Sequence, residues 1–398
     1  MNYKQGSVLG GMLLVAGSCV GAGMLALPIL TGLAGFYPSL IVMVVAWSFM
    51  TFTGLLLIEV NGWFKQQVNL ISMTQESLGR SGRILAWLSY LFLFYSLLVA
   101  YTAASGKVFA AILESFLEVA VPPWVASMFF TFLFGVIVYL GTRTVDLVNR
   151  FLMIGLIATY LGMIGLGLSR IDPGLLAYSM PQYTLLSLPV LVVSFGFQNM
   201  IPSLTAYMKG DLKRVRASII GGSLITLFVY LIWSMLVLGV VAPAEIHNSY
   251  LRGEEATIPL RSMLGSTGIS QFAQGFAFFA IVTSFLAQGL TLTHFLADGF
   301  KLQPKRSNVW WLASLALLPP LALALYNPTI FFSALSFAGG VCAMILFGIL
   351  PICMAWVGRY TDRHASHYHV SGGKPSLIIG FFFALLVIGC ELFKLFFG

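Results

Sequence analysis

The chain has 398 residues, of which 59% are hydrophobic and only 9% are charged, and its mean hydropathy is +0.94. This composition excludes a soluble domain and predicts a polytopic membrane protein. The formal charge of +8 fits contact with anionic lipid and gives no support to nucleic-acid binding. The four cysteines lack the spacing of a disulfide framework or a zinc site; they are Cys19, Cys342, Cys353 and Cys390.

Windows of about 20 apolar residues predict eleven membrane-spanning helices. The longest hydrophilic connection, about 241–270, has room for only a short helix or two, so no soluble catalytic domain is expected. We therefore interpret 1–398 as one membrane domain. The predicted spans are 8–34, 38–60, 84–113, 124–141, 148–169, 184–208, 216–240, 271–299, 308–325, 329–357 and 376–397.

The positions of Lys and Arg predict the orientation. With the N-terminus in the cytoplasm, most of the 21 basic residues fall in cytoplasmic segments, as the positive-inside rule requires. Eleven crossings then leave the C-terminus outside. The first apolar run is too long and too rich in glycine for a cleaved signal peptide, so we expect it to be retained as a helix.

Two predicted spans are interrupted by glycine and proline. The first interruption lies in Gly17–Pro28 and the second in Ser194–Pro202. A broken membrane helix frees backbone groups that cost several kcal/mol each unless protein, water or ligand pairs with them. Two such breaks at matching positions of two halves indicate a transporter whose substrate binds between them. The alternative is a small-residue packing face and an ordinary proline kink.

The two breaks also match each other. One offset places Pro28 on Pro202 and Ala22 on Gly196. Because each half would contain five spans, an odd number, the second half would cross the membrane in the opposite sense. The predicted architecture is a pair of inverted five-helix repeats, 8–169 and 184–357, with 376–397 as an added helix.

Several stretches resemble one known family. They are residues 21–28, 145–152, 194–197 with 202–208, and 372–375, and they are similar to the aromatic and hydroxy amino acid permeases, among them the bacterial tyrosine-specific transport proteins. The resemblance implies the leucine-transporter-like fold of the amino acid–polyamine–organocation superfamily. It also implies import of aromatic amino acids across the bacterial cytoplasmic membrane by alternating access, coupled to an ion and usually to protons. It leaves the choice among tyrosine, tryptophan and phenylalanine open.

The first break suits the carboxylate of a zwitterion. Unpaired N–H groups at Gly21, Ala22 and Gly23, together with the positive end of the helix dipole, favour an anion. Glycine lets the ligand approach the backbone. The Ser18 hydroxyl can assist either charged group of the ligand. The freed carbonyls expected to accept from the ammonium lie near Gly17, Ser18, Ser194 and Phe195.

The second break carries candidates for binding the substrate side chain. Phe195 and Phe197, beside Gly196, would stack on an aromatic ring, and Gln198 would hydrogen-bond a phenol or indole. Tyr95 lies near the middle of the third predicted span. The alternative is that these residues belong to the core, since the chain has 33 phenylalanines. Relatives often have histidine where Gln198 stands, and glutamine does not titrate.

The coupling ion, H⁺ or Na⁺, is the only cofactor expected. The fifth predicted span lacks the lysine that stands in for sodium in some proton-coupled members of the superfamily. Thr283 and Ser284 could ligate Na⁺, or could instead hydrogen-bond within their own helix. Glu59 could carry a proton, or could instead pair with backbone donors at the membrane surface.

Other functional classes find less support. His364, His367 and His369 could form a metal or pH site, but they are not grouped with the acidic or cysteine ligands of a typical metal site, so a solvated loop is expected. A membrane-embedded enzyme would need clustered carboxylates, histidines or cysteines, and a channel would need lining rings or a filter. The expected partners are an aromatic amino acid and the lipid bilayer, and the oligomeric state is left open.

Overall fold

The computed structural model describes residues 5–64, 68–265, 268–302, 306–362 and 368–397. Within these ranges the regular structure is helical throughout and no strand occurs, as the composition predicts. The helices are α1 (Val8–Cys19), α2 (Ala22–Gly32), α3 (Phe36–Asn61), α4 (Leu70–Leu117), α5 (Pro123–Tyr139), α6 (Thr142–Gly167), η1 (Leu168–Arg170), α7 (Pro173–Leu176), η2 (Pro181–Ser187), α8 (Leu188–Ser194), η3 (Gln198–Met200), α9 (Ile201–Tyr207), α10 (Leu212–Val240), α11 (Pro243–Leu251), α12 (Thr257–Leu264), α13 (Gly268–Gly299), α14 (Arg306–Tyr326), α15 (Phe331–Phe337), η4 (Ala338–Ile349), α16 (Leu350–Trp356), η5 (Val357–Thr361) and α17 (Gly373–Phe397).

Nine helical stretches of the described residues are long and apolar enough to cross a membrane. The pair α1 and α2 makes a tenth if it is taken as one span bent by 63°. The apolar helix α5 is shorter, with 17 residues. The second predicted break is also observed, because η2, α8, η3 and α9 form one interrupted stretch over 181–207.

Two predicted segments differ in detail from the structure. The third span, expected over 84–113, belongs to the much longer α4, which contains a break at Gly79 (φ +71°, ψ −161°). Glycine adopts this positive φ without strain, so α4 consists of two helical pieces that meet at a kink at Gly79. The tenth span, expected over 329–357, includes a π-helical segment, η4, whose twelve residues loosen the turns beside α8.

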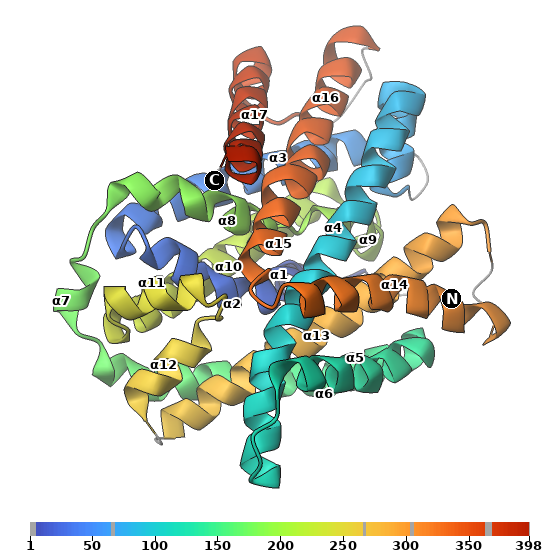
Figure 1. The fold of residues 1–398 in the computed structure, drawn as a ribbon. Helices are drawn as coiled ribbons and strands as arrows, with labels where there is room; N and C mark the ends of the chain where they lie inside the picture. The colour runs from blue at the N-terminus through green and yellow to red at the C-terminus, as the bar shows by residue number, and fades with distance from the viewer. Residues whose placement is uncertain (1–4, 65–67, 266–267, 303–305, 363–367, 398) are drawn as a thin grey trace.

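The helices pack around the α1–α2 break. α1 lies along α10, α13 lies along α6 and α4, and η4 packs against α8, α17 and α4. In Figure 1 the short helices α7, α11 and α12 gather at one end of the bundle, and the N-terminus lies at the opposite end. Segments far apart in sequence therefore meet at the centre.

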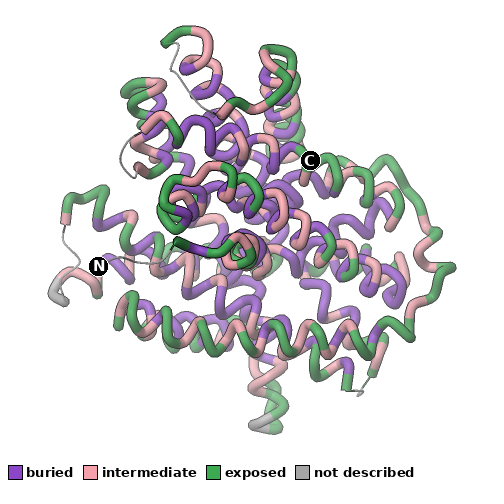
Figure 2. Tube along the Cα trace, turned by 180° about the vertical axis from the view of Figure 1, so that it is seen from behind, coloured by how far each residue is buried: buried purple, intermediate pink, exposed green. Residues whose placement is uncertain are grey.

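Burial separates an inner set of helices from an outer set. The span windows are 61% buried in α10 but only 17% buried in α6 and 28% in α17. Large apolar side chains such as Phe132 and Ile379 are exposed on the outside, and Figure 2 shows the exposed positions on the periphery with buried ones inside. An apolar exterior of this kind is what contact with lipid tails requires.

Candidate substrate site

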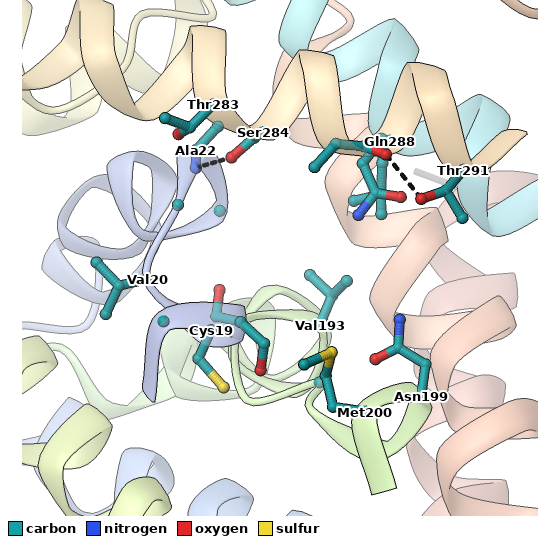
Figure 3. A pocket seen from close by; sticks show the side chains of 18 of the residues that line it. Cys19, Val20, Ala22, Val193, Asn199, Met200, Thr283, Ser284, Gln288 and Thr291 are labelled. Atoms are coloured by element: carbon teal, nitrogen blue, oxygen red, sulfur yellow. Dashed lines mark hydrogen bonds between the residues drawn. The ribbon is translucent and has the colours of Figure 1, made fainter. Parts of the chain in front are cut away.

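A cavity of about 490 Å³ lies at the α1–α2 break. Its walls come from α1, α2, α4, α6, α8, α13 and η4, with residues Asn199 and Met200 closing one side. Figure 3 shows α13 above the break and the α8–η3 connection below it. The volume is in the range of pockets that enclose small molecules.

The break is held open by a contact with α13. α1 ends at Cys19 and α2 begins at Ala22, whose N–H donates to Ser284 Oγ over 2.8 Å (Figure 3). A Cβ on Gly21 would lie 2.6 Å from the same oxygen. The backbone of Gly21 is extended (φ −167°), a conformation that any residue can adopt. Glycine is therefore required here by the close approach of α13, which leaves no room for a Cβ.

α10 pairs with the carbonyls that the two breaks release. Pro28 has no N–H, so the Met24 carbonyl loses its helical donor and accepts from Trp233 Nε1 over 2.9 Å. The hydroxyl of the buried Tyr230 lies 2.7 Å from the Cys19 carbonyl oxygen and 2.8 Å from that of Ser194. One side chain thus ties the end of α1 to the end of α8.

Several polar groups at the break remain unpaired. Among the described residues, none donates to the Gly17 and Ser18 carbonyls, and none accepts from the N–H groups of Gly21 and Gly23. Ser194 Oγ is buried without a partner, and a Cβ on Gly23 would lie 3.2 Å from it. The prediction of an unpaired N–H is wrong for Ala22, which donates to Ser284. Two N–H groups and one hydroxyl are therefore left at the start of α2, where the helix dipole favours an anion.

Nine of the residues that the sequence singles out line this cavity. They are Gly17, Ser18, Gly21, Ala22, Gly23, Ser194, Gly196, Thr283 and Ser284. The Ser18 hydroxyl donates to the Val15 carbonyl over 2.7 Å. The Ser194 carbonyl accepts from Tyr230, and the Phe195 carbonyl accepts from the Phe197 N–H. Of the four carbonyls predicted to bind the ammonium, those of Gly17 and Ser18 therefore have no donor among the described residues, and Ser194 has a free hydroxyl instead.

The aromatic and amide candidates of the second break point elsewhere. Phe195 is fully buried against Tyr230, with ring centroids 5.1 Å apart. Phe197 is also buried, and its ring would be only 2.7 Å from a Cβ on Gly54. Gln198 Nε2 donates to the Met50 carbonyl over 3.0 Å. All three are core residues, as the alternative interpretation holds.

Tyr95 also lies off the cavity wall, because its hydroxyl donates to the Leu315 carbonyl of α14 over 2.9 Å. Its neighbour Phe94 faces the cavity instead, together with Leu97 and with Phe347 of η4. Successive residues of a helix point in directions that differ by about 100°. Phe94 therefore faces the cavity, whereas the next residue, Tyr95, faces α14.

Sequence inspection missed a polar row on α13. Ser284, Gln288 and Thr291 all line the cavity, and their spacing of four and three residues places them on one face of the helix. Asn149 of α6 and Asn199 line it as well. The spacing that leads from the predicted Ser284 to Gln288 and Thr291 is visible in the sequence.

The ion-coupling candidates of α13 have backbone partners. Thr283 Oγ1 donates to the carbonyl of Phe279 over 2.8 Å, which is the contact within its own helix that the alternative predicts. Ser284 Oγ accepts from Ala22 N–H. Both residues line the cavity, yet the hydroxyl of each already forms a hydrogen bond with a backbone group.

Glu59 lies outside the cavity, at the end of α3, in a buried polar cluster. Arg359 of η5 donates to both of its carboxylate oxygens over 2.6 Å, and the Val370 N–H donates over 2.8 Å. His369 Nδ1 lies 3.1 Å from Glu59 Oε1, whereas His364 and His367 fall outside the described residues. No group of three metal-ligating side chains occurs in the described part of the chain.

Comparison with known proteins gives the family. Residues 4–391 match the tryptophan/tyrosine permease family. The chain is 32% identical to Tyrosine-specific transport system 1 of Haemophilus influenzae, over 98% of this chain and 95% of that protein. It is 30% identical to Tyrosine-specific transport system 2, over 96% of both chains, and 31% identical to the Tryptophan-specific transport protein, over 96% and 94%, both from the same organism. The chain therefore belongs to the tryptophan/tyrosine permease family.

Proposed function

We propose that this protein is a secondary active transporter that imports aromatic amino acids, tyrosine foremost, across the bacterial cytoplasmic membrane. The observation that carries the proposal is the group of unpaired donors at the α1–α2 break, the N–H groups of Gly21 and Gly23 with Ser194 Oγ, beside an apolar cavity wall. Membership of a permease family favours transport over the membrane-embedded enzyme.

A zwitterionic aromatic amino acid fits this arrangement without a charged side chain. Its carboxylate would accept from the three donors at the start of α2, and its ammonium would donate to the carbonyls of Gly17 and Ser18. Its ring would lie against Phe94 and Phe347, where aromatic contact adds to apolar burial. A charged side chain that paired with the carboxylate or the ammonium would be costly to bury inside the membrane.

A second cavity that adjoins the first supports alternating access. Phe94, Asn199 and Thr291 also line a second cavity of about 530 Å³ that reaches residues 68–71, on the predicted cytoplasmic side. Across α2 from this path, the Ala256 N–H donates to the Leu25 carbonyl over 3.0 Å. We assign the structure to an inward-facing state with eleven crossings, α5 included, a cytoplasmic N-terminus and an external C-terminus.

We further propose the inverted-repeat architecture, with halves at 8–169 and 184–357, and coupling to protons. The matching breaks in α1–α2 and α8–η3 support the repeat. The Ser284 hydroxyl already accepts from the Ala22 N–H, which leaves it less able to ligate sodium, a hard cation that prefers several oxygen ligands. Sodium coupling and a broader range of neutral substrates are the competing proposals.

Reconstitution tests the function directly. Proteoliposomes with an acidic exterior should accumulate labelled tyrosine above its external concentration, and should lose this accumulation when the pH gradient is collapsed. Accumulation driven by a sodium gradient alone would show that sodium, and not the proton, is the coupling ion. A protein that accumulates none of tyrosine, tryptophan and phenylalanine under either gradient is not an aromatic amino acid transporter.

A further inference from the structure

The cavity contains buried amide groups that the backbone site does not use. Gln288 Oε1 and Asn149 Oδ1 are both buried and have no hydrogen-bond partner, and both residues line the cavity. Buried polar atoms in proteins are nearly always paired. Two unpaired amide oxygens in one cavity therefore point to a ligand that supplies the missing partner.

The position of Gln288 suits the far end of an aromatic side chain. Ser284 touches the start of α2, and Gln288 lies one turn further along α13, about 6 Å away along the helix axis. This separation is comparable with the length of a tyrosine side chain. Figure 3 shows Gln288 extending into the cavity from α13, with Asn199 directed towards it from the opposite side.

The wall between these two polar regions is apolar. Leu93, Phe94 and Leu97 of α4 and Phe347 of η4 line the cavity together with Met153 of α6. A ring placed there would have its backbone end at the broken helix and its polar atom at the amides. An amide offers both a donor and an acceptor, so it can pair with a phenol hydroxyl or an indole N–H.

We propose that Gln288, assisted by Asn149, is the specificity-determining residue of the substrate site and selects aromatic amino acids that carry a polar ring atom. This inference rests on the proposed function. Tyrosine and tryptophan satisfy the buried amide, and phenylalanine leaves it unpaired. A site built to hydrogen-bond its substrate rejects an analogue without that group far more strongly than an apolar pocket does.

The test is displacement of labelled tyrosine from the purified protein, because binding is measurable even when turnover is lost. In the wild-type protein, unlabelled tyrosine and tryptophan should displace the label at concentrations at least about tenfold lower than phenylalanine. Gln288→Met keeps the length of the side chain and removes its amide. Its tyrosine-to-phenylalanine ratio should fall towards one, and Asn149→Leu should shift it in the same direction by less.

Gln198→Met is the matched control, since it removes a buried glutamine whose amide already pairs with Met50 and Thr53. It should weaken all ligands alike and keep the wild-type ratio. The proposal is overturned if Gln288→Met keeps the wild-type ratio, if it binds no aromatic amino acid, or if Gln198→Met lowers the ratio equally. Failure of the wild-type protein to bind any of the three would instead contradict the proposed function.

Discussion

At the scale of single residues, the backbone part of the site was predictable and the side-chain part was not. Glycine and proline inside an apolar run have few structural explanations, so they located the break at Gly21 and Ala22 within a residue. Ring contacts depend on the rotation of helices that are apolar on all sides. No pattern in the sequence separated Phe94 from Tyr95, whereas the four-residue spacing from Ser284 to Gln288 was a usable signal.

Gly23 gives the prediction at this scale. A Cβ there would lie 3.2 Å from Ser194 Oγ, so alanine requires a shift of only a few tenths of an ångström. Leucine would fill the position that we propose for the substrate carboxylate. Gly23→Leu should lower tyrosine uptake in proteoliposomes by about 100-fold at equal protein content, and Gly23→Ala should be much milder. Loss of the leucine variant from the membrane would show that Gly23 serves packing.

At the scale of elements, α10 was underestimated. Its sequence reads as an ordinary apolar span, yet it supplies Tyr230 and Trp233, which pair with carbonyls of both broken helices. The breaks were predictable because they follow from local chemistry. Their partners were not, because a hydrogen bond between residues more than 200 positions apart depends on tertiary packing.

Tyr230→Phe tests this role. The substitution leaves the Cys19 and Ser194 carbonyls buried without a donor, a loss of about 1–3 kcal/mol for an unpaired group, at the edge of the substrate site. We expect a lower melting temperature together with weaker tyrosine binding. Tyr160→Phe is the control, because its hydroxyl donates to the Val229 carbonyl away from the cavity. It should lower the melting temperature and preserve affinity; equal affinity in both variants would contradict the role of Tyr230.

At the scale of the whole molecule, hydropathy predicted a bundle of apolar helices with room for a short helix or two in its longest connection, and the described residues form such a bundle, with α11 and α12 in that connection. The π-helical segment was not predictable, since it follows from how neighbouring helices pack. Nor did the sequence reveal that the connection before α12 buries a carboxyl group, Glu255, next to the broken helix α2.

Glu255 makes the stability of the molecule depend on pH. It is buried at 1% exposure, and burial raises its pKa from 4.5 to about 7, against the opposing effect of hydrogen bonds from Thr257. The folded state therefore holds a proton that the unfolded state releases, so this contribution is complete below about pH 4.5 and is lost as the pH rises through 7. The melting temperature should fall between about pH 5 and pH 8.

Glu255→Gln should flatten this profile, because glutamine keeps the neutral form at every pH. Melting curves of the detergent-purified protein measure the effect, and exposed Glu76 offers Glu76→Gln as a control that leaves the slope in place. An unchanged slope in Glu255→Gln would assign the pH dependence to other groups.

The partners of the first broken helix also determine when it can be completed during synthesis. The Cys19 and Met24 carbonyls and the Ala22 N–H are paired by Tyr230, Trp233 and Ser284, all of which are translated after half of the chain. Until α10 and α13 emerge from the ribosome, α1 and α2 cannot enter lipid without unpaired backbone groups. The pairing of the first broken helix is therefore completed only after its later neighbours have been synthesised.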